Sequence, residues 1–234
     1  MNEVFTRVIN LIGQEKFVQI NNKSVLVVGL GGVGGYALEG LVRSGIGKLI
    51  IADKDVVDIT NLNRQIIATQ QTVGKLKTEV FSERIHSINR DAEVIEISEF
   101  INENNLEKLF ENKVDFVVDA IDTMTSKIIL WKYCQQHNIP LIASLGMARR
   151  LDPTKLKITV LGKTENDPMA KALRSMARKQ NMSLNIPVIF STEKPLEDSL
   201  SLKTNLGSMM FVPATAGLMM AYYVINSLID KENK

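Results

Sequence analysis

Short apolar runs rich in β-branched residues alternate with longer segments of mixed polarity between residues 24 and 145. Each run has the length of one strand, and unbroken apolar runs are typical of strands that a parallel sheet buries on both faces. In the segments between them, apolar positions recur at helical spacing. The expected strands are residues 24–30, 48–53, 93–98, 114–122 and 139–145, and the expected helices are 34–47, 72–89, 104–112 and 126–138.

This alternation predicts the α/β class, with a doubly wound, mostly parallel, Rossmann-like sheet. After the fifth run the rhythm changes, and apolar runs at 156–161 and 186–191 predict a C-terminal extension of two strands that flank one helix. The pattern indicates one continuous domain over 1–234. Its first part covers about 20–150 and its second part about 151–234.

The most apolar segment of the chain, MMFVPATAGLMMAYYVINSLI, lies near its C-terminal end. Pro213, Gly217 and Asn226 interrupt it, so no run of about eighteen apolar residues, the length that crosses a bilayer, remains. The segment therefore predicts a buried final helix that begins near Pro213 or Ala214. The polar stretch 193–207 before it is expected to be a mobile loop and a candidate lid.

The composition is that of an ordinary soluble globular protein, with 45% hydrophobic residues, 23% charged residues and a formal net charge of +2. The single cysteine, Cys134, excludes an internal disulfide and a cysteine-based zinc cluster, and it favours a reducing cytoplasm. The first residues lack the basic-then-apolar order of a secretory signal. Cys134 and Trp131 lie in a segment with core character, and His86 and His137 have no companion ligands, so we expect all four to be structural or solvent-exposed.

A glycine-rich turn follows the first strand, in the stretch VVGLGGVGG. Gly29, Gly31 and Gly34 match the pattern G-x-G-x-x-G, and Gly32 adds a fourth glycine. Such a turn lets the backbone approach phosphate closely, and the helix that follows directs its first N–H groups at the anion. Asp53, at the end of the second strand, is placed to accept a hydrogen bond from a ribose hydroxyl. These features fit NAD and ATP equally well, and a merely tight strand-to-helix turn remains the third interpretation.

The residues after Asp53 favour ATP. Asn61, Asn63 and Arg64 lie in a loop at the carboxyl end of the second strand, and Lys77 lies in the first half of the next expected helix. A dinucleotide carries about two negative charges on its pyrophosphate, which a glycine turn commonly satisfies, whereas a triphosphate carries about four and calls for cations aimed at it. Arg64 and Lys77 supply those cations.

Two acids follow the fourth strand, in the sequence DAID. Asp119 and Asp122 are expected at the same edge of the sheet as the glycine turn, because the carboxyl ends of parallel strands meet there. A carboxylate in this place is suited to hold Mg²⁺ together with nucleotide phosphates.

The stretch from Val25 to Gln65 resembles the adenylating domain of the ubiquitin-activating superfamily, which includes bacterial activators of molybdopterin- and thiamine-pathway carrier proteins. The resemblance implies that MgATP is bound, with Asp122 as the metal ligand. It also implies a homodimer in which Arg7 enters the partner's site, although Val4 stands where relatives commonly have a further arginine. The implied nucleotide-binding residues are Gly29, Gly31, Gly32, Gly34, Asp53, Asn61, Asn63, Arg64, Lys77, Asp119 and Asp122.

Within this superfamily, carrier activators commonly bind zinc through two C-x-x-C pairs, which the sequence lacks. The segments LDPTK (151–155) and KTENDPMA (163–170) are similar to those of the tRNA threonylcarbamoyladenosine dehydratases, and the similarity extends nearly end to end. It implies an ATP-dependent cyclisation of the threonylcarbamoyl group on the adenosine next to the anticodon. The identity of the tRNAs, a helper protein from a sulfur relay, and a peripheral association with membranes stay open.

Basic residues gather between Arg149 and Lys179, where nine Lys or Arg face three Asp or Glu. Asp167 and Pro168 are typical of a helix start, and the basic residues after them share one helical face. This face is predicted to contact tRNA phosphates rather than bases, because aromatic residues are sparse, and no DNA is expected; an ordinary solvated face is the alternative. The residues are Lys171, Arg174 and Arg178, with Arg149, Arg150 and Lys155 nearby in sequence.

Three other functions remain to be distinguished from the dehydratase. An activator of a small sulfur-carrier protein would adenylate the C-terminal glycine of its carrier and need no RNA. An NAD-dependent dehydrogenase would bind nicotinamide and be indifferent to the loss of Arg64. A non-catalytic adaptor would bind ATP without releasing pyrophosphate.

Overall fold

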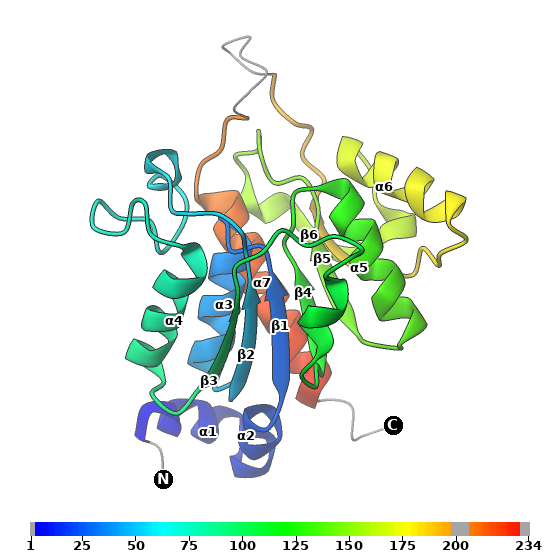
Figure 1. The fold of residues 1–234 in the computed structure, drawn as a ribbon. Coiled ribbons are helices and arrows are strands. Elements are labelled where there is room, and N and C mark those ends of the chain that lie inside the picture. The colour runs from blue at the N-terminus through cyan, green and yellow to red at the C-terminus, as the bar shows by residue number, and fades with distance from the viewer. Residues whose placement is uncertain (1–2, 198–205, 230–234) are drawn as a thin grey trace.

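A single seven-stranded sheet organises the protein in a computed structural model, which describes residues 3–197 and 206–229 (Figure 1). The strand order is β3-β2-β1-β4-β5-β7-β6. The strands are β1 (Ser24–Val28), β2 (Lys48–Ala52), β3 (Glu93–Ile97), β4 (Phe116–Asp119), β5 (Leu141–Ser144), β6 (Leu156–Val160) and β7 (Pro187–Ser191).

The chain adds β2 and β3 outward on one side of β1, and β4 then begins the other half of the sheet on the opposite side of β1. β1 pairs in parallel with β2 on one side and with β4 on the other, so Val27 lies opposite both Ile51 and Val118. β5 and β7 continue the parallel part, and β6 pairs antiparallel with β7. The predicted doubly wound, mostly parallel sheet is confirmed, and its switch point lies at the carboxyl ends of β1 and β4, where such folds bind ligands.

Helices cover both faces of the sheet (Figure 1). The helices that do so are α3 (Gly34–Ser44), α4 (Lys77–Ile88), α5 (Met124–Gln136), α6 (Pro168–Lys179) and α7 (Phe211–Ile229). Side chains of β1 alternate between the two faces: Val25 and Val27 pack with α3, α4 and α7, and Leu26 and Val28 pack with α5 and α6. The central strands are therefore buried on both sides, as their unbroken apolar runs predict.

The final helix packs closely against α3. A Cβ added at Gly217 would lie 2.2 Å from the carbonyl oxygen of Val33, and one at Gly40 would lie 2.7 Å from the Cβ of Ala221, so small residues set the distance between the two helices. By length and composition alone α7 could cross a membrane, but half of its apolar window is buried inside the protein. The predicted buried C-terminal helix is confirmed, and it begins at Phe211, two residues before Pro213.

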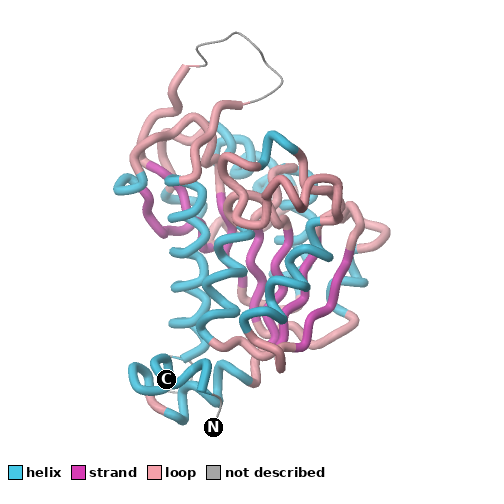
Figure 2. Tube along the Cα trace, turned by 90° about the vertical axis from the view of Figure 1, so that its left-hand side faces the viewer, coloured by secondary structure: helices cyan, strands magenta, loops and turns pink. Residues whose placement is uncertain are grey.

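Two short helices, α1 (Thr6–Ile12) and α2 (Gln14–Asn21), precede the sheet and lie below the amino ends of its strands in Figures 1 and 2. Phe5 and Phe17 pack together there with ring centroids 5.4 Å apart. Gln19 Nε2 donates a hydrogen bond of 2.8 Å to the carbonyl of Leu228, which ties α2 to the end of α7. The sequence pattern did not predict these two helices.

Two predicted helices differ from those observed. The segment 72–89 becomes helical at Lys77, because Gly74 has a left-handed φ of +87° and residues 74–77 hydrogen-bond to residues 55–57 instead. The segment 104–112 forms a 3₁₀ turn, Leu106–Phe110, rather than an α-helix. All seven predicted strands are present, each within a few residues of its expected ends.

The expected loop at 193–207 lies partly outside the described residues, since 198–205 are not described. Both of its described ends form a backbone hydrogen bond with Arg149: Leu196 N donates to Arg149 O, and Arg149 N donates to Gly207 O, both at 2.8 Å. The prediction that this loop acts as a lid stays a prediction.

Candidate nucleotide-binding site

The glycine turn lies at the switch point, between β1 and the start of α3. Gly29 has a left-handed φ of +88°, and a Cβ there would lie 2.6 Å from the carbonyl oxygen of Ala120, just after β4. A Cβ at Gly34 would lie 1.8 Å from the carbonyl oxygen of Gly29. At Gly31, by contrast, the nearest atom is Gln65 Nε2 at 3.9 Å. Packing therefore requires glycine at positions 29 and 34, whereas at Gly31 the backbone is left open to a ligand.

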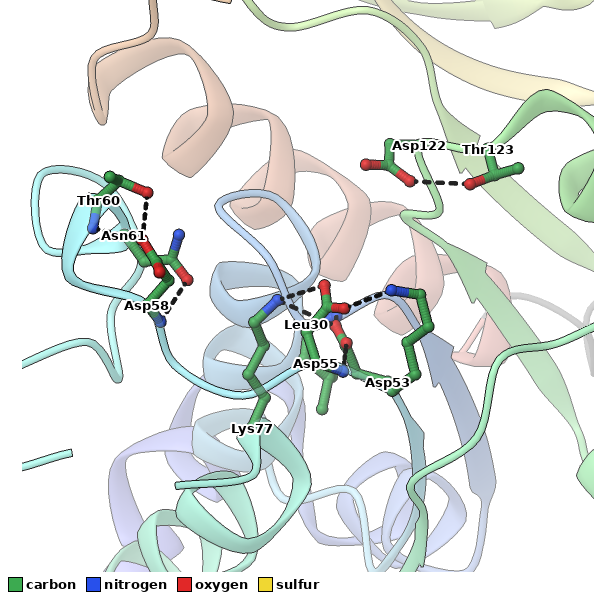
Figure 3. Close-up of polar contacts among 10 residues, drawn as sticks. Leu30, Asp53, Asp55, Asp58, Thr60, Asn61, Lys77, Asp122 and Thr123 are labelled. Atoms are coloured by element: carbon green, nitrogen blue, oxygen red, sulfur yellow. Dashed lines mark hydrogen bonds and ion pairs between the residues drawn. The ribbon is translucent and has the colours of Figure 1, made fainter. Parts of the chain in front are cut away.

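Asp53 links the glycine turn to the next strand. Its Oδ2 accepts a hydrogen bond of 2.7 Å from Leu30 N, and its Oδ1 accepts one of 2.8 Å from Asp55 N (Figure 3). A carboxylate that accepts from backbone N–H groups on two sides holds both segments in register. Asp53 thus lies beside the glycine turn, where a ribose acceptor is expected.

Lys77, the first residue of α4, points at the same carboxylates. Its Nζ lies 3.1 Å from Asp55 Oδ2 and 3.7 Å from Asp53 Oδ2, and its side chain is only 6% exposed (Figure 3). Partial burial acts to raise the pKa of Asp55, but the hydrogen bonds and charges of Lys54 and Lys77 outweigh burial and hold that pKa below its ordinary value. The result is a cation that two carboxylates hold in place at the edge of the sheet.

The loop that carries Arg64 is braced from within. Asp58 caps the short turn Ile59–Asn61, and the buried Asn61 returns a hydrogen bond by accepting from Asp58 N at 3.1 Å. Arg64 Nη1 donates to Thr60 O at 2.8 Å and to Asn63 Oδ1 at 2.9 Å. The guanidinium is thus held over its own loop, and the Cγ of the Arg64 side chain lies 3.5 Å from a Cβ built on Gly32, in the glycine turn.

Asn63 also connects this loop to the approach to α7. Its Nδ2 donates a hydrogen bond of 2.8 Å to the carbonyl of Ser208. Residues 145 positions apart in sequence therefore meet at the edge of the site.

The two acids of the DAID turn have different environments. Asp122 is exposed, and its Oδ1 accepts from Thr123 Oγ1 at 3.2 Å (Figure 3). Among the described residues, no three His, Cys, Asp or Glu side chains form a ready metal cage. Mg²⁺ bound through phosphates commonly takes only one or two protein carboxylates, so the single exposed Asp122 fits that ion.

Asp119 was predicted to contact a nucleotide, but the structure places its side chain in the core. This carboxylate is 0% exposed, and Lys127, Trp131 and the backbone N–H of Ile121 donate to it. With both oxygens bound inside the protein, it acts behind the site rather than in it. Lys127 is not among the residues predicted from the sequence, although a lysine one helical turn from Trp131 on an otherwise apolar stripe of α5 is a signal for a buried anionic partner.

Arg7 is exposed on α1, at the amino ends of the strands and so at the opposite end of the sheet from the glycine turn (Figure 1). Within one chain this placement keeps Arg7 away from the site. Only a second copy of the chain can bring an Arg7 to it.

The basic segment is partly used for structure. Asp167 caps α6 by accepting from Ala170 N at 2.9 Å, as predicted, and Lys171 and Arg178 are exposed on that helix. Arg174 instead donates to the carbonyl and hydroxyl oxygens of Thr164. The expectation that Arg150 faces RNA is wrong, because it is 2% exposed and binds Asp167 and three backbone carbonyls.

The fold and the site define an α/β protein with a nucleotide-binding edge of the adenylating type. The chain belongs to the ThiF family, whose model matches residues 5–234. It is 40% identical over 232 residues to a tRNA threonylcarbamoyladenosine dehydratase of Bacillus subtilis (strain 168), covering 93% of this chain and 91% of that protein. To the dehydratase of Escherichia coli (strain K12) it is 36% identical over 190 residues, covering 78% and 71%.

Solved structures agree with this similarity. Crystal structures of the E. coli tRNA N6-threonylcarbamoyladenosine dehydratase in complex with AMP and with ATP match the fold with TM-scores of 0.93 and 0.92. Each is 32% identical in sequence and covers 99% of this chain and 96% of the other.

Cys134 is predicted to be inert in the folded protein. It is buried in α5, and burial raises the pKa of its thiol to about 12, with the nearby Asp119 adding to the rise. About one thiol in 10⁴ is then ionised at pH 8. We expect a disulfide reagent such as DTNB to label native protein at less than about a hundredth of its rate with free cysteine, and to label guanidinium-unfolded protein with one equivalent. Fast stoichiometric labelling of the native protein would contradict this and reopen a thioester role.

Proposed function

We propose that the protein is an ATP-dependent tRNA threonylcarbamoyladenosine dehydratase. The observation that carries the proposal is the similarity to dehydratases over nearly the whole chain, the second part included, and not only over the nucleotide-binding half. The glycine turn, Asp53 and the ion-paired Lys77 at the switch point fit the ATP that such a reaction consumes.

The chemistry requires no nucleophile from the protein. The substrate's own carboxylate attacks the α-phosphorus of ATP, forming an acyl-adenylate and releasing pyrophosphate. A nitrogen of the same threonylcarbamoyl group then attacks the activated carbonyl, the ring closes and AMP leaves, so that one water is lost overall. Because the attack is intramolecular, positioning supplies much of the rate. The burial of Cys134 fits this scheme.

Each residue at the edge has a role in this scheme. The backbone of Gly29, Gly31, Gly32 and Gly34 and the first turn of α3 cradle the phosphates, and Asp53 accepts from the ribose. Asn61 and Asn63 shape the loop that presents Arg64. Arg64 and Lys77 stabilise the charge that gathers on the leaving pyrophosphate.

Asp122 would hold Mg²⁺, which neutralises phosphate charge when it is bound. The exposure of Asp122 and its position directly after the turn that packs on Gly29 support this role. Asp119 has no direct contact with nucleotide in this proposal, because its oxygens are bound within the protein.

The position of Arg7 and an apolar stripe on α7 support a homodimer, which is part of the proposal. Phe211, Leu218 and Tyr222, spaced seven and four residues apart on one helical face, are 56%, 50% and 63% exposed. A second copy of the chain is the occupant we propose for this stripe, with Arg7 of the partner completing the site. One adenylating domain over 1–234 then comprises a nucleotide-binding part, about 20–150, and a substrate and dimer part, about 151–234.

We place the protein in the cytoplasm with its tRNA substrate. The proposal includes no zinc, no DNA and no membrane span, and it does not require a helper protein from a sulfur relay. The remaining alternative, an activator of a small sulfur-carrier protein, would show adenylation of the carrier and no need for RNA.

The reaction itself is the first test. Bulk tRNA incubated with the protein and MgATP should yield a modified adenosine lighter by one water, measured by mass spectrometry of digested nucleosides. Arg64→Ala should lower the rate by about 10²–10³-fold, because it removes a donor to developing negative charge. Arg90→Ala, an exposed arginine at the other end of the sheet, is the matched control and should leave the rate unchanged. No product from the wild type, or full activity of Arg64→Ala, would contradict the assignment.

The trans role of Arg7 predicts complementation. Arg7→Ala and Arg64→Ala homodimers should each be nearly inactive, whereas co-expression should restore activity. Random assembly makes about half of the dimers mixed, and each mixed dimer has one intact site, so about a quarter of the wild-type sites are recovered. Steady-state rates of co-expressed and singly expressed protein measure this. Activity in the mixture no higher than in the parents would place both arginines in the same chain's site or outside it.

The exposed face of α6 predicts how RNA binding depends on salt. Lys171→Glu/Arg178→Glu should weaken tRNA binding and lower the slope of log Kobs against log [salt] by about 2, since two phosphate contacts are lost. Lys16→Glu/Arg90→Glu makes the same change of charge near the amino ends of the strands and serves as the control. Filter binding at several salt concentrations measures both. If the two variants show equal slopes of log Kobs against log [salt], the exposed face of α6 does not contact tRNA phosphates and is an ordinary solvated helix face.

A further inference from the structure

A buried ion pair lies directly behind the turn that carries Asp122. Lys127 Nζ of α5 lies 3.0 Å from Asp119 Oδ2 at the end of β4, and both side chains are 0% exposed. Trp131 Nε1 donates to the same oxygen at 2.6 Å, and the lysine ammonium lies 5.8 Å from the centre of the indole ring. Solvent reaches neither charge, so each depends on the other.

The second oxygen of Asp119 holds the turn. It accepts a hydrogen bond of 3.0 Å from Ile121 N, and Ala120 N donates to Val28 O at 2.8 Å. The carbonyl of Ala120 in turn fills the space that a Cβ on Gly29 would take. Residues 120 and 121 are thus held between the buried carboxylate and the glycine turn, and Asp122 follows directly.

Stability alone is a weak reason to bury these charges. Removing a lysine and a carboxylate from water is costly, and a well-packed apolar pair of similar size is commonly as stable or more stable. An apolar pair, however, has no acceptor for the N–H of Ile121. The arrangement therefore points to a role in the geometry of the turn.

We propose that Lys127 is a positioning residue: by pairing with Asp119 it holds the turn at 120–121, and with it the carboxylate of Asp122 beside the phosphates. The inference rests on the proposed function, in which Asp122 would hold Mg²⁺. Without the ammonium, the buried carboxylate has no counter-charge, so it either takes up a proton or turns toward water, and either change weakens or breaks the hydrogen bond that it accepts from Ile121 N. Asp122 then loses its fixed place.

Lys127→Met tests the inference, because it keeps the length of the side chain and removes the charge. The control is Ile128→Ala, the next residue of α5, which is 1% exposed and lowers stability by leaving a cavity without touching Asp119. Two measurements are made on each folded protein. The first is hydrogen exchange of the Ile121 amide without nucleotide, and the second is calorimetric affinity for MgATP and for AMP.

The expected result is selective. In Lys127→Met the Ile121 amide should exchange about tenfold faster or more relative to the Leu26 amide of β1, which reports on the core. Affinity for MgATP should fall by about 10–100-fold, as for other groups that orient a metal ligand, and affinity for AMP should fall less. Ile128→Ala should change the exchange of Ile121 and Leu26 together and leave MgATP affinity near the wild-type value.

Exchange at Ile121 that changes only in step with Leu26, or an unchanged MgATP affinity, would overturn the inference and leave the pair a structural one. If Lys127→Met does not fold, Lys127→Gln takes its place, because it also removes the charge while keeping a polar end group within the same site. Lys127→Arg should restore both measurements. A wild type that binds no MgATP would end the proposed function, whereas the exchange of Ile121 would still decide the role of Lys127.

Discussion

The contact between the glycine turn and the end of β4 is the constraint on which the rest of the site depends. Gly29 and Ala120 touch so closely that no side chain fits at Gly29. Because β1 and β4 are adjacent parallel strands, this contact brings the start of α3 and the DAID turn to one point. The glycine turn and the exposed Asp122 lie close together there because the backbone of Gly29, after β1, packs against the backbone of Ala120, after β4.

Carboxylates in three settings surround that point, and burial decides what each can do. Asp119 is sealed in the core and shapes a turn, Asp53 is mostly covered and ties two loops, and Asp122 is exposed and available to a ligand. The same chemical group thus holds a turn in the core, hydrogen-bonds two loops together, or is available to bind a ligand, depending on its burial. At Asp55, burial acts to raise the pKa and the neighbouring Lys54 and Lys77 act to lower it, and the net result is a lowered pKa.

The sequence predicted the sheet well because its strands are buried on both faces, and unbroken apolar runs mark such strands clearly. The glycine turn and the loop that carries Arg64 were likewise found from spacing and residue type. The start of α4 was not, because it depends on the left-handed Gly74 and on the tertiary pairing of 74–77 with 55–57. The helices α1 and α2 were also missed, because at 7 and 8 residues they are too short to display a clear helical period.

Burial was the property that the sequence conveyed least well. Asp119, Arg150 and Arg174 were expected to face ligands because they are charged, yet the first two lie in the core, and Arg174 is bound to Thr164. Whether a charge has a partner within the fold depends on residues far away in sequence, such as Glu193 and Asp167 around Arg150. A single sequence does not display those pairings.

The hydrogen bond from Asn63 to the carbonyl of Ser208 joins the arginine loop to the chain that enters α7. The other end of the same amide, Asn63 Oδ1, accepts a hydrogen bond from Arg64, so this one side chain contacts both the arginine and the chain that enters α7. In the homodimer proposed on α7, binding of ATP and association of the subunits would then be thermodynamically linked. Such linkage is reciprocal: the free energy that ATP binding adds to subunit association equals the free energy that association adds to ATP binding.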